Sequence, residues 1–311
     1  MAVTNGWGQG VENNTIEWGK GKDNATNNWG KVYETSASGD TLLEVATPSF
    51  SNTKSVNFDG VDDYVDCGDN DNLSFGNASN DSAFSISAWI KASANNFIIV
   101  SKDISGKDEY LFYINSGDEL SLVLSDYIIT DRRSRNSGDI SSNYNNWIHV
   151  VATYNGVGGT NADNGIKLYL NAVQVDSGTN NAGSYTAMHN GNAPLTIGNY
   201  NNALFADGNI DEVAIFNSEL SASDVTAIYN SGTPQSLASY NPVSWWRMGD
   251  GDTFPTLTDN GSGGNNGTMT NMVSGDIVAD VPPTFNKYSL SFDGVDDNVK
   301  LNSNTQNFTD F

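Results

Sequence analysis

Short segments in which apolar and polar residues alternate recur along the chain between about residues 47 and 233. The clearest of them is 83–90, where Phe84, Ile86 and Ala88 are separated by serines. This period of two is typical of β-strands, and each segment is bounded by Gly, Asn, Asp or Ser. The other predicted strands are 55–65, 97–100, 110–114, 120–124, 147–154, 166–170, 195–197 and 210–216. Only 221–229 has a helical pattern, so the sequence predicts an antiparallel β-sandwich.

A six-residue string divides the chain. Phe-Asp-Gly-Val-Asp-Asp occupies 58–63 and returns unchanged at 292–297, an offset of 234 residues. Such a repeat indicates tandem modules. A polar linker with two prolines follows residue 233, and 243–248 has the pattern of a new strand. We therefore predict a sandwich over 46–234, and over 235–311 a linker with the beginning of a second, incomplete module.

The first segment, 1–45, has a different repeat. Trp7, Trp18 and Trp29 are 11 residues apart, and the first two begin a Trp-Gly-x-Gly motif. The glycines disfavour a helix, and three such units are too small to fold alone. We predict that the segment anchors the protein or assembles it, with a homotrimer favoured over docking to another protein. The alternative is a disordered tail rich in Gly and Asn.

Composition excludes some partners. The chain has 14 Lys and Arg against 37 Asp and Glu, a net charge of −23, which argues against nucleic acid. The one basic cluster, 132–135, is predicted to be a solvated loop. No stretch is apolar enough to insert into a membrane, and the N-terminus lacks the pattern of a secretory signal. Release inside a virus particle is one localisation consistent with this. The acidity indicates either solubility in salty water or calcium binding.

Four fragments carry a family resemblance: 55–65, 84–90, 147–156 and 208–217. In this order they resemble the laminin G-like, concanavalin A-like lectin/glucanase module; Ala172 departs from its pattern, which has Gly there. The resemblance implies an all-β jelly roll of two sheets that binds glycans or proteins, often with calcium. The Trp-Gly-x-Gly repeat resembles the start of virion structural proteins from marine tailed phages.

Calcium is the predicted cofactor. Asp59, Asp62 and Asp63 lie on one turn at Gly60, and calcium prefers carboxylate oxygens from a tight loop. The family resemblance implies that Asp211, on the last strand, joins them. The alternative is a hairpin turn whose aspartates are solvated.

No catalytic residue is predicted. The glucanases of this fold need paired carboxylates on one strand face, and the adjacent Asp211 and Glu212 would alternate to opposite faces. His149 is predicted to be structural. Trp89 and Trp147 are predicted to be core residues, whereas the loop tyrosines are better placed to stack on a sugar without any one standing out: Tyr127, Tyr144 and Tyr200.

Taken together, the sequence predicts a non-enzymatic virion appendage, such as a fibre or decoration protein, that binds a host-surface glycan and contacts other virion proteins. Tandem copies would strengthen weak binding at each site. The first alternative is a bacterial secreted or surface adhesin of the same module type. The second is a glycan-active enzyme on the same fold.

Overall fold

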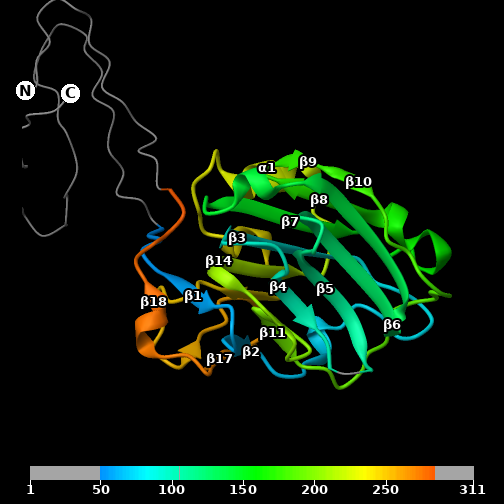
Figure 1. Ribbon diagram of the computed structural model, residues 1–311, viewed down its shortest axis with the longest axis horizontal. Helices are drawn as coiled ribbons and strands as arrows, with labels where there is room; N and C mark the ends of the chain where they lie inside the picture. Colours follow the sequence, from blue (N-terminus) through cyan, green and yellow to red (C-terminus); the bar gives the residue numbers. More distant parts are fainter. Residues whose placement is uncertain (1–49, 105, 284–311) are drawn as a thin grey trace, which may run out of the picture. The chain divides into compact units, whose positions relative to one another are not determined.

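Two antiparallel sheets pack face to face around an apolar core in the computed structural model, which describes residues 50–104 and 106–283 (Figure 1). The predicted all-β sandwich is therefore confirmed. The Trp-Gly segment 1–45 and the second copy of the repeat at 292–297 lie outside the described residues. No helix in the described ranges is long and apolar enough to cross a membrane.

Sheet 1 has strands from both ends of the described chain. Its order is β18 (Ile277–Val278), β1 (Ser55–Asp59), β14 (Asp207–Phe216), β3 (Phe84–Ala92), β7 (Ile148–Tyr154), β8 (Ile166–Leu170) and β9 (Val173–Gln174), with β15 (Ser244–Trp246) also paired to β14. Its inner face is apolar because alternate residues of each strand point the same way. In β3, for example, Phe84, Ile86 and Ile90 are all fully buried in the core.

Sheet 2 forms the other layer. Its order is β10 (Asp176–Gly178), β6 (Glu119–Asp139), β5 (Asp108–Ile114), β4 (Phe97–Lys102), β11 (Leu195–Ile197), β2 (Tyr64–Asp66), β17 (Gly267–Thr270) and β16 (Thr256–Leu257). A separate ribbon is made by β12 (Asn199–Tyr200) and β13 (Leu204–Phe205). Short 3-10 turns connect some of these strands: Asp71–Leu73, Ser141–Asn143, Gly159–Gly165, Ala238–Tyr240 and Ser274–Asp276.

The predicted helix, α1 (Ala222–Tyr229), covers the outer face of sheet 1. Ser221 caps its first turn, since its side chain accepts from the backbone N–H of Asp224 and the Asp224 carboxylate accepts from the N–H of Ser221. At its other end the Tyr229 ring stacks 5.9 Å from that of Trp89 and 5.8 Å from that of His149. Trp89 is thus buried, but beneath the helix rather than between the sheets.

The segment that follows the helix completes both sheets. We call residues 244–278 the closing segment: β15 and β18 extend sheet 1 on β14 and β1, and β17 with β16 extends sheet 2 on β2. It also supplies core side chains, among them Trp246, Met248 and Leu257, all 0% exposed. The prediction that a second module begins with the strand at 243–248 is therefore wrong, because that strand pairs within the first sandwich.

Two carboxylates, one inside this segment and one just after it, hold it in place. Asp250 accepts from the backbone N–H of Thr53 at 2.8 Å and from its hydroxyl at 2.6 Å. Asp280 accepts from Lys91 Nζ at 2.6 Å and from Trp147 Nε1 at 2.9 Å, so Trp147 is a half-buried rim residue and not the predicted core residue. The Ser55 hydroxyl donates to the backbone carbonyl of Asp280 at 2.5 Å, which joins the two ends of the folded unit.

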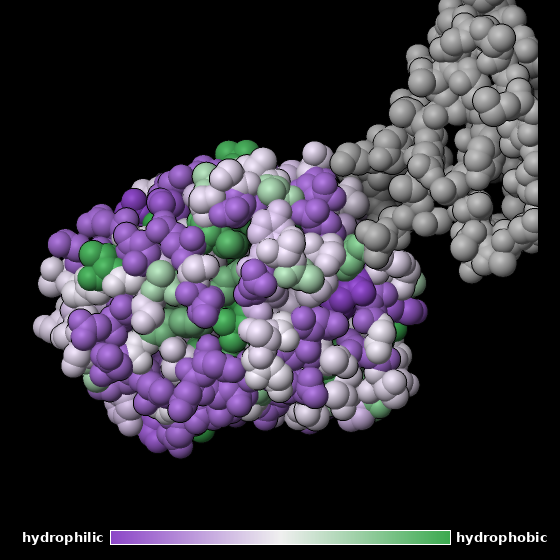
Figure 2. All heavy atoms as spheres, turned by 180° about the vertical axis from the view of Figure 1, so that it is seen from behind, coloured by the Kyte–Doolittle hydropathy of each residue, from purple (hydrophilic) through white to green (hydrophobic). Residues whose placement is uncertain are grey.

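The surface of the unit is mainly polar. Figure 2 shows one face on which hydrophilic residues predominate and apolar residues form small patches. The exposed large apolar side chains of the described residues are scattered: Val61, Ile104, Tyr127, Val157, Val173 and Val273. A broad apolar interface is not evident among them, so smaller features of the surface carry the functional argument.

Candidate functional site

A hollow of about 150 Å³ lies on the outer face of sheet 2. It exists because β5 and β6 carry apolar residues on both faces: Phe112 and Ile114 enter the core, while Leu111 and Tyr113 alternate to the outside. We call it the sheet 2 hollow. Its lining residues are Leu111, Tyr113, Asn115, Ser121, Val123, Ile129, Arg132, Ser134, Asn136, Asn180, Tyr200 and Leu204.

The floor of the hollow is a small apolar cluster separate from the main core. Ile98, Leu111 and Val123 are buried there, with two tyrosines, Tyr113 and Tyr200, packed against them. Tyr200 is held by the β12–β13 ribbon, in which it pairs with Leu204. The ribbon thus brings an aromatic ring from a distant part of the chain to the side of β5 and β6.

The polar side chains of the hollow are fixed by mutual hydrogen bonds. The Ser121 hydroxyl donates to Asn136 Oδ1 at 2.8 Å, and Asn136 Nδ2 donates to Glu119 Oε2 at 3.0 Å. Asn115 Nδ2 donates to the same carboxylate oxygen at 3.0 Å. On the opposite side, the backbone N–H of Asn180 donates to the Ser134 hydroxyl at 2.9 Å. Amides and hydroxyls held in this way suit a polyhydroxylated ligand.

Both tyrosine hydroxyls are neutral donors at physiological pH. Burial raises the pKa of Tyr113, and it raises the pKa of Tyr200 to about 12, although the Arg132 charge opposes both shifts. Tyrosine combines an apolar ring with a polar hydroxyl, the combination that recognises a sugar ring and its hydroxyl groups together. Of the three tyrosines considered from sequence, only Tyr200 lines the hollow.

The other two tyrosines are placed elsewhere. Tyr144 donates to Asp118 Oδ1 at 2.7 Å, and the Tyr127 ring lies 5.1 Å from that of His189. The predicted solvated loop at 132–135 is wrong, because these residues belong to strand β6 and Arg133 is only 6% exposed. Arg132 lines the hollow, whereas Arg135 pairs with Asp176 at 3.4 Å.

Three of the four predicted calcium ligands come together. Carboxylate oxygens of Asp59, Asp62 and Asp63 all lie within 4.8 Å of one another on the turn at Gly60, whose φ of 77° favours glycine. The turn uses part of this capacity: Asp59 Oδ1 accepts from the N–H of Val61 at 2.8 Å, and Asp63 Oδ2 accepts from the N–H of Asp59 at 3.1 Å.

Asp63 is the buried member of this turn, 5% exposed. Burial, with help from the neighbouring carboxylates of Asp59, Asp276 and Asp62, raises its pKa to about 6, although the hydrogen bond from the backbone of Asp59 opposes the rise. The concentrated negative charge, with Asp59 and Asp62 open to solvent, is chemistry that fits a hard divalent cation. It supplies three of the six to eight oxygens that calcium requires.

Asp211 does not join them. The pairing of β1 with β14 places Asp207 opposite Asp59, four positions earlier than Asp211. Asp211 is instead fully buried, where it accepts from Asn52 Nδ2 at 2.7 Å. The predicted four-residue ligand set therefore reduces to three residues, and the strand register is the reason.

A β-bulge at Asp211 and Glu212 changes the predicted alternation. β14 advances three residues, from Asp211 to Ala214, while β3 advances two. Glu212 has a φ of 49° and is buried, accepting from Trp245 Nε1 at 2.6 Å. Burial raises the pKa of both carboxyls. The Glu212 charge raises the pKa of Asp211 further, whereas the Arg247 charge opposes the rise at Glu212.

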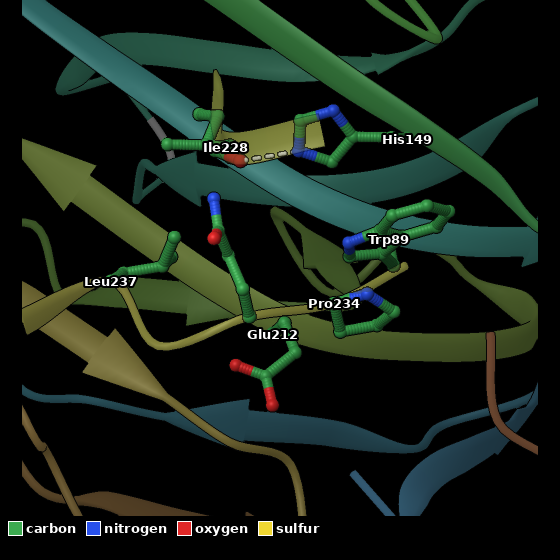
Figure 3. A pocket seen from close by; sticks show the side chains of 8 residues that line it. Trp89, His149, Glu212, Ile228, Pro234 and Leu237 are labelled. Carbon is green, nitrogen blue, oxygen red and sulfur yellow. Dashed lines mark hydrogen bonds between the residues drawn. The ribbon is translucent and has the colours of Figure 1, made fainter. Parts of the chain in front are cut away.

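Glu212 borders a second, much smaller cavity of about 10 Å³ beneath α1 (Figure 3). Trp89, His149 and Pro234 are among its lining residues, and Leu237 lies across from Trp89 in this view. Burial lowers the pKa of His149 to about 3, and its Nε2 lies 2.9 Å from the Ser87 hydroxyl, which supports the predicted structural role. The space holds about one water molecule, so no substrate enters it.

The comparisons agree with this architecture. Residues 59–226, more than half of the chain, match the model of a family described as the concanavalin A-like lectin/glucanases superfamily. The chain belongs to this superfamily. The predicted family is therefore confirmed, and the family description includes both lectins and glucanases. No curated protein matches the chain.

Solved structures of low sequence identity align with part of the chain. A candidate carbohydrate-binding protein from Bacteroides ovatus aligns with a TM-score of 0.52 and 16% identity. The alignment covers 76% of this chain and 62% of that protein's length. A heptameric SAP-like pentraxin from Limulus polyphemus aligns with a TM-score of 0.37 and 14% identity, over 60% of this chain and 83% of its own. The botulinum neurotoxin DC binding domain, solved with SialylT, has a TM-score of 0.35 and 23% identity, with coverage of 48% and 35%.

Proposed function

We propose that this superfamily member binds a glycan, without catalysis, in the sheet 2 hollow. The observation that supports it best is the combination of two tyrosines with fixed amides and hydroxyls around 150 Å³ of space. A cavity of about this volume accommodates a benzene-sized ring in other proteins, so one sugar ring suits the hollow. The description of the Bacteroides ovatus protein as a candidate carbohydrate-binding protein is consistent with this function.

The composition of the hollow argues against hydrolysis. Retaining glycosidases need two carboxyl groups about 5–5.5 Å apart. None of the described residues that line the hollow is an Asp or a Glu, and the buried Asp211–Glu212 pair lies beyond the reach of substrate. Hydrolysis of a β-glucan by the purified chain would restore the enzyme hypothesis.

Replacing Tyr200 tests the glycan proposal directly. We expect Tyr200→Ala to weaken glycan affinity about tenfold or more, because the variant loses both a ring face and a hydroxyl donor. Array screening of the full chain identifies the glycan, and calorimetry then compares the variants. Tyr127→Ala is the matched control, since Tyr127 is an exposed tyrosine outside the lining. Equal losses in both variants would place the site elsewhere.

We also propose that the protein is a virion appendage, a fibre or decoration protein, in which the module is displayed in several copies and contacts other virion proteins. Its support is in the sequence: the Trp-Gly-x-Gly resemblance and the tandem repeat. Light scattering of the full chain, compared with a chain that starts at Thr47, tests it. If only the full chain is a trimer, the proposal is supported. If both chains are monomeric, the alternative of a bacterial adhesin is favoured.

Calcium remains a proposal for the turn at Gly60, with Asp59, Asp62 and Asp63 as ligands. We expect millimolar calcium to raise the melting temperature by about 5 °C if it exceeds the dissociation constant 100-fold. Asp62→Asn should abolish the rise, because it removes one of the three carboxylate ligands. Asp62 is chosen because its side chain makes none of the turn's hydrogen bonds, so the turn itself is preserved. Asp139→Asn, at another exposed turn, is the control. Identical melting curves with calcium and with chelator would exclude the site.

A further inference from the structure

This inference rests on the proposed glycan site and concerns its ligand class. Arg132 is the one charged side chain among the described residues that line the sheet 2 hollow. The nearby carboxylate of Glu119 is already engaged by the side-chain amides of Asn115 and Asn136, each at 3.0 Å. The cation is therefore the main electrostatic feature that a ligand in the hollow would meet.

The guanidinium of Arg132 is held by neutral groups. Its Nε donates to the backbone carbonyl of Asn180 at 3.1 Å, one terminal nitrogen donates to Asn180 Oδ1 at 2.9 Å, and the other donates to the carbonyl of Ile129 at 2.9 Å. The ion pairs within the described ranges include Arg135 and Arg247 but not Arg132. Its positive charge is fixed in position without a carboxylate partner.

Counting donors shows what is left for a ligand. A guanidinium has five N–H hydrogens, and the three bonds use one on each nitrogen. One hydrogen therefore remains on each terminal nitrogen, which matches the two oxygens of a carboxylate. Tyr113 and Tyr200 add hydroxyl donors close enough for the Arg132 charge to act on both. All of these groups donate, and a carboxylate only accepts.

We propose that the sheet 2 hollow selects a carboxylated sugar, a hexuronic acid or a sialic acid, whose carboxylate binds Arg132 while its ring packs on Tyr113 and Tyr200. A neutral sugar would fill the same space but leave the guanidinium without its counter-ion. The site is thus specific for charge as well as for shape. Arginine suits this role better than lysine because its fork is planar and binds both oxygens.

The test compares sugars that differ only in the charged group. Calorimetry with the full chain would measure oligoglucuronate against the matching oligoglucose, and a sialylated against the matching desialylated oligosaccharide. We expect at least one acidic member to bind about tenfold or more tightly than its neutral partner. Arg132→Gln should remove this preference while neutral binding persists, and Arg132→Lys should restore part of it.

Arg135→Gln is the matched control, since it removes the same charge from the same strand but Arg135 already pairs with Asp176. Equal affinity for acidic and neutral sugars, with no effect of Arg132→Gln on the ratio, would overturn the inference and leave the glycan proposal standing. A preference for sulfated over carboxylated sugars would also overturn it. If Tyr200→Ala and Arg132→Gln both leave all sugar binding unchanged, the proposed site itself fails.

Discussion

A chain that ends at Pro234 is expected to lose the cooperative folding of the sandwich. Such a chain lacks the closing segment, so β14, β1 and β2 lose the strands that pair with them there. The core loses Trp246, Met248, Leu257 and Met269 at the same time. Open sheet edges next to an exposed core favour aggregation. Circular dichroism and size-exclusion chromatography would show this, whereas a chain that ends at Pro283 should fold.

A single substitution in the closing segment should cause a smaller loss of stability that can be measured. Trp246 is 0% exposed, and its Nε1 donates to the backbone carbonyl of Asn265 at 2.8 Å. Trp246→Ala should lower the free energy of unfolding by about 3–5 kcal/mol in urea titration, because it leaves a cavity and an unpaired carbonyl. Val273→Ala, at a position 63% exposed on the same segment, should change it by less than about 0.5 kcal/mol. Unaltered melting of the chain that ends at Pro234 would instead establish a domain boundary there.

The second large effect concerns a lysine inside sheet 2. Lys102 is 0% exposed, and its Nζ donates to Asp69 Oδ1 at 2.9 Å and to the backbone carbonyl of Ala193 at 2.6 Å, with Glu109 Oε1 3.7 Å away. Burial raises the pKa of Glu109, and the Lys102 charge opposes that rise. Lys102→Met should destabilise the fold by about 3–5 kcal/mol, since it leaves a buried carboxylate without its counter-ion.

A second variant separates this cause from a simple packing defect. Adding Glu109→Gln to Lys102→Met should recover a large part of the lost stability, because the buried charge is then absent. Lys107→Met is the control: Lys107 bonds to the side chain of Asn192 at an exposed position, so its loss should cost little. Urea unfolding of the four proteins would decide. Equal stability of Lys102→Met and the parent would refute the interpretation.

The strands were predictable from sequence because their alternation is local. The pattern at 83–90 led to β3, and the pattern at 221–229 led to α1 with its Ser221 cap. Sequence analysis assigns the closing segment to the wrong module, because a local pattern predicts a strand but not the strand with which it pairs. Its β17 pairs with β2, about 200 residues earlier. Only the tertiary fold determines whether such strands close the preceding sheet or begin the next one.

The candidate site was less predictable than the fold. The sheet 2 hollow combines Tyr113 on β5, Arg132 on β6 and Tyr200 on β12, which are distant in the chain. One local signal existed: in 110–114 every residue is apolar or aromatic, which indicates a strand with an apolar outer face. The bulge at Asp211 could not be predicted from alternation, because the pattern assumes that every residue changes face. One extra residue in β14 breaks that rule and moves the later side chains to the other face.

The hydrogen bond between Ser55 and Asp280 has a consequence for how such a unit can be carried by a longer protein. The chain enters and leaves the unit at neighbouring points, because Ser55 lies beside Val278 and Asp280. A unit of this kind can be inserted between two segments of a longer protein without moving those segments far apart. The repeated string at 58–63 recurs 234 residues later, at 292–297. A stalk or a surface loop could therefore gain or lose whole units by duplication in register, and so change its number of binding sites without changing its own span.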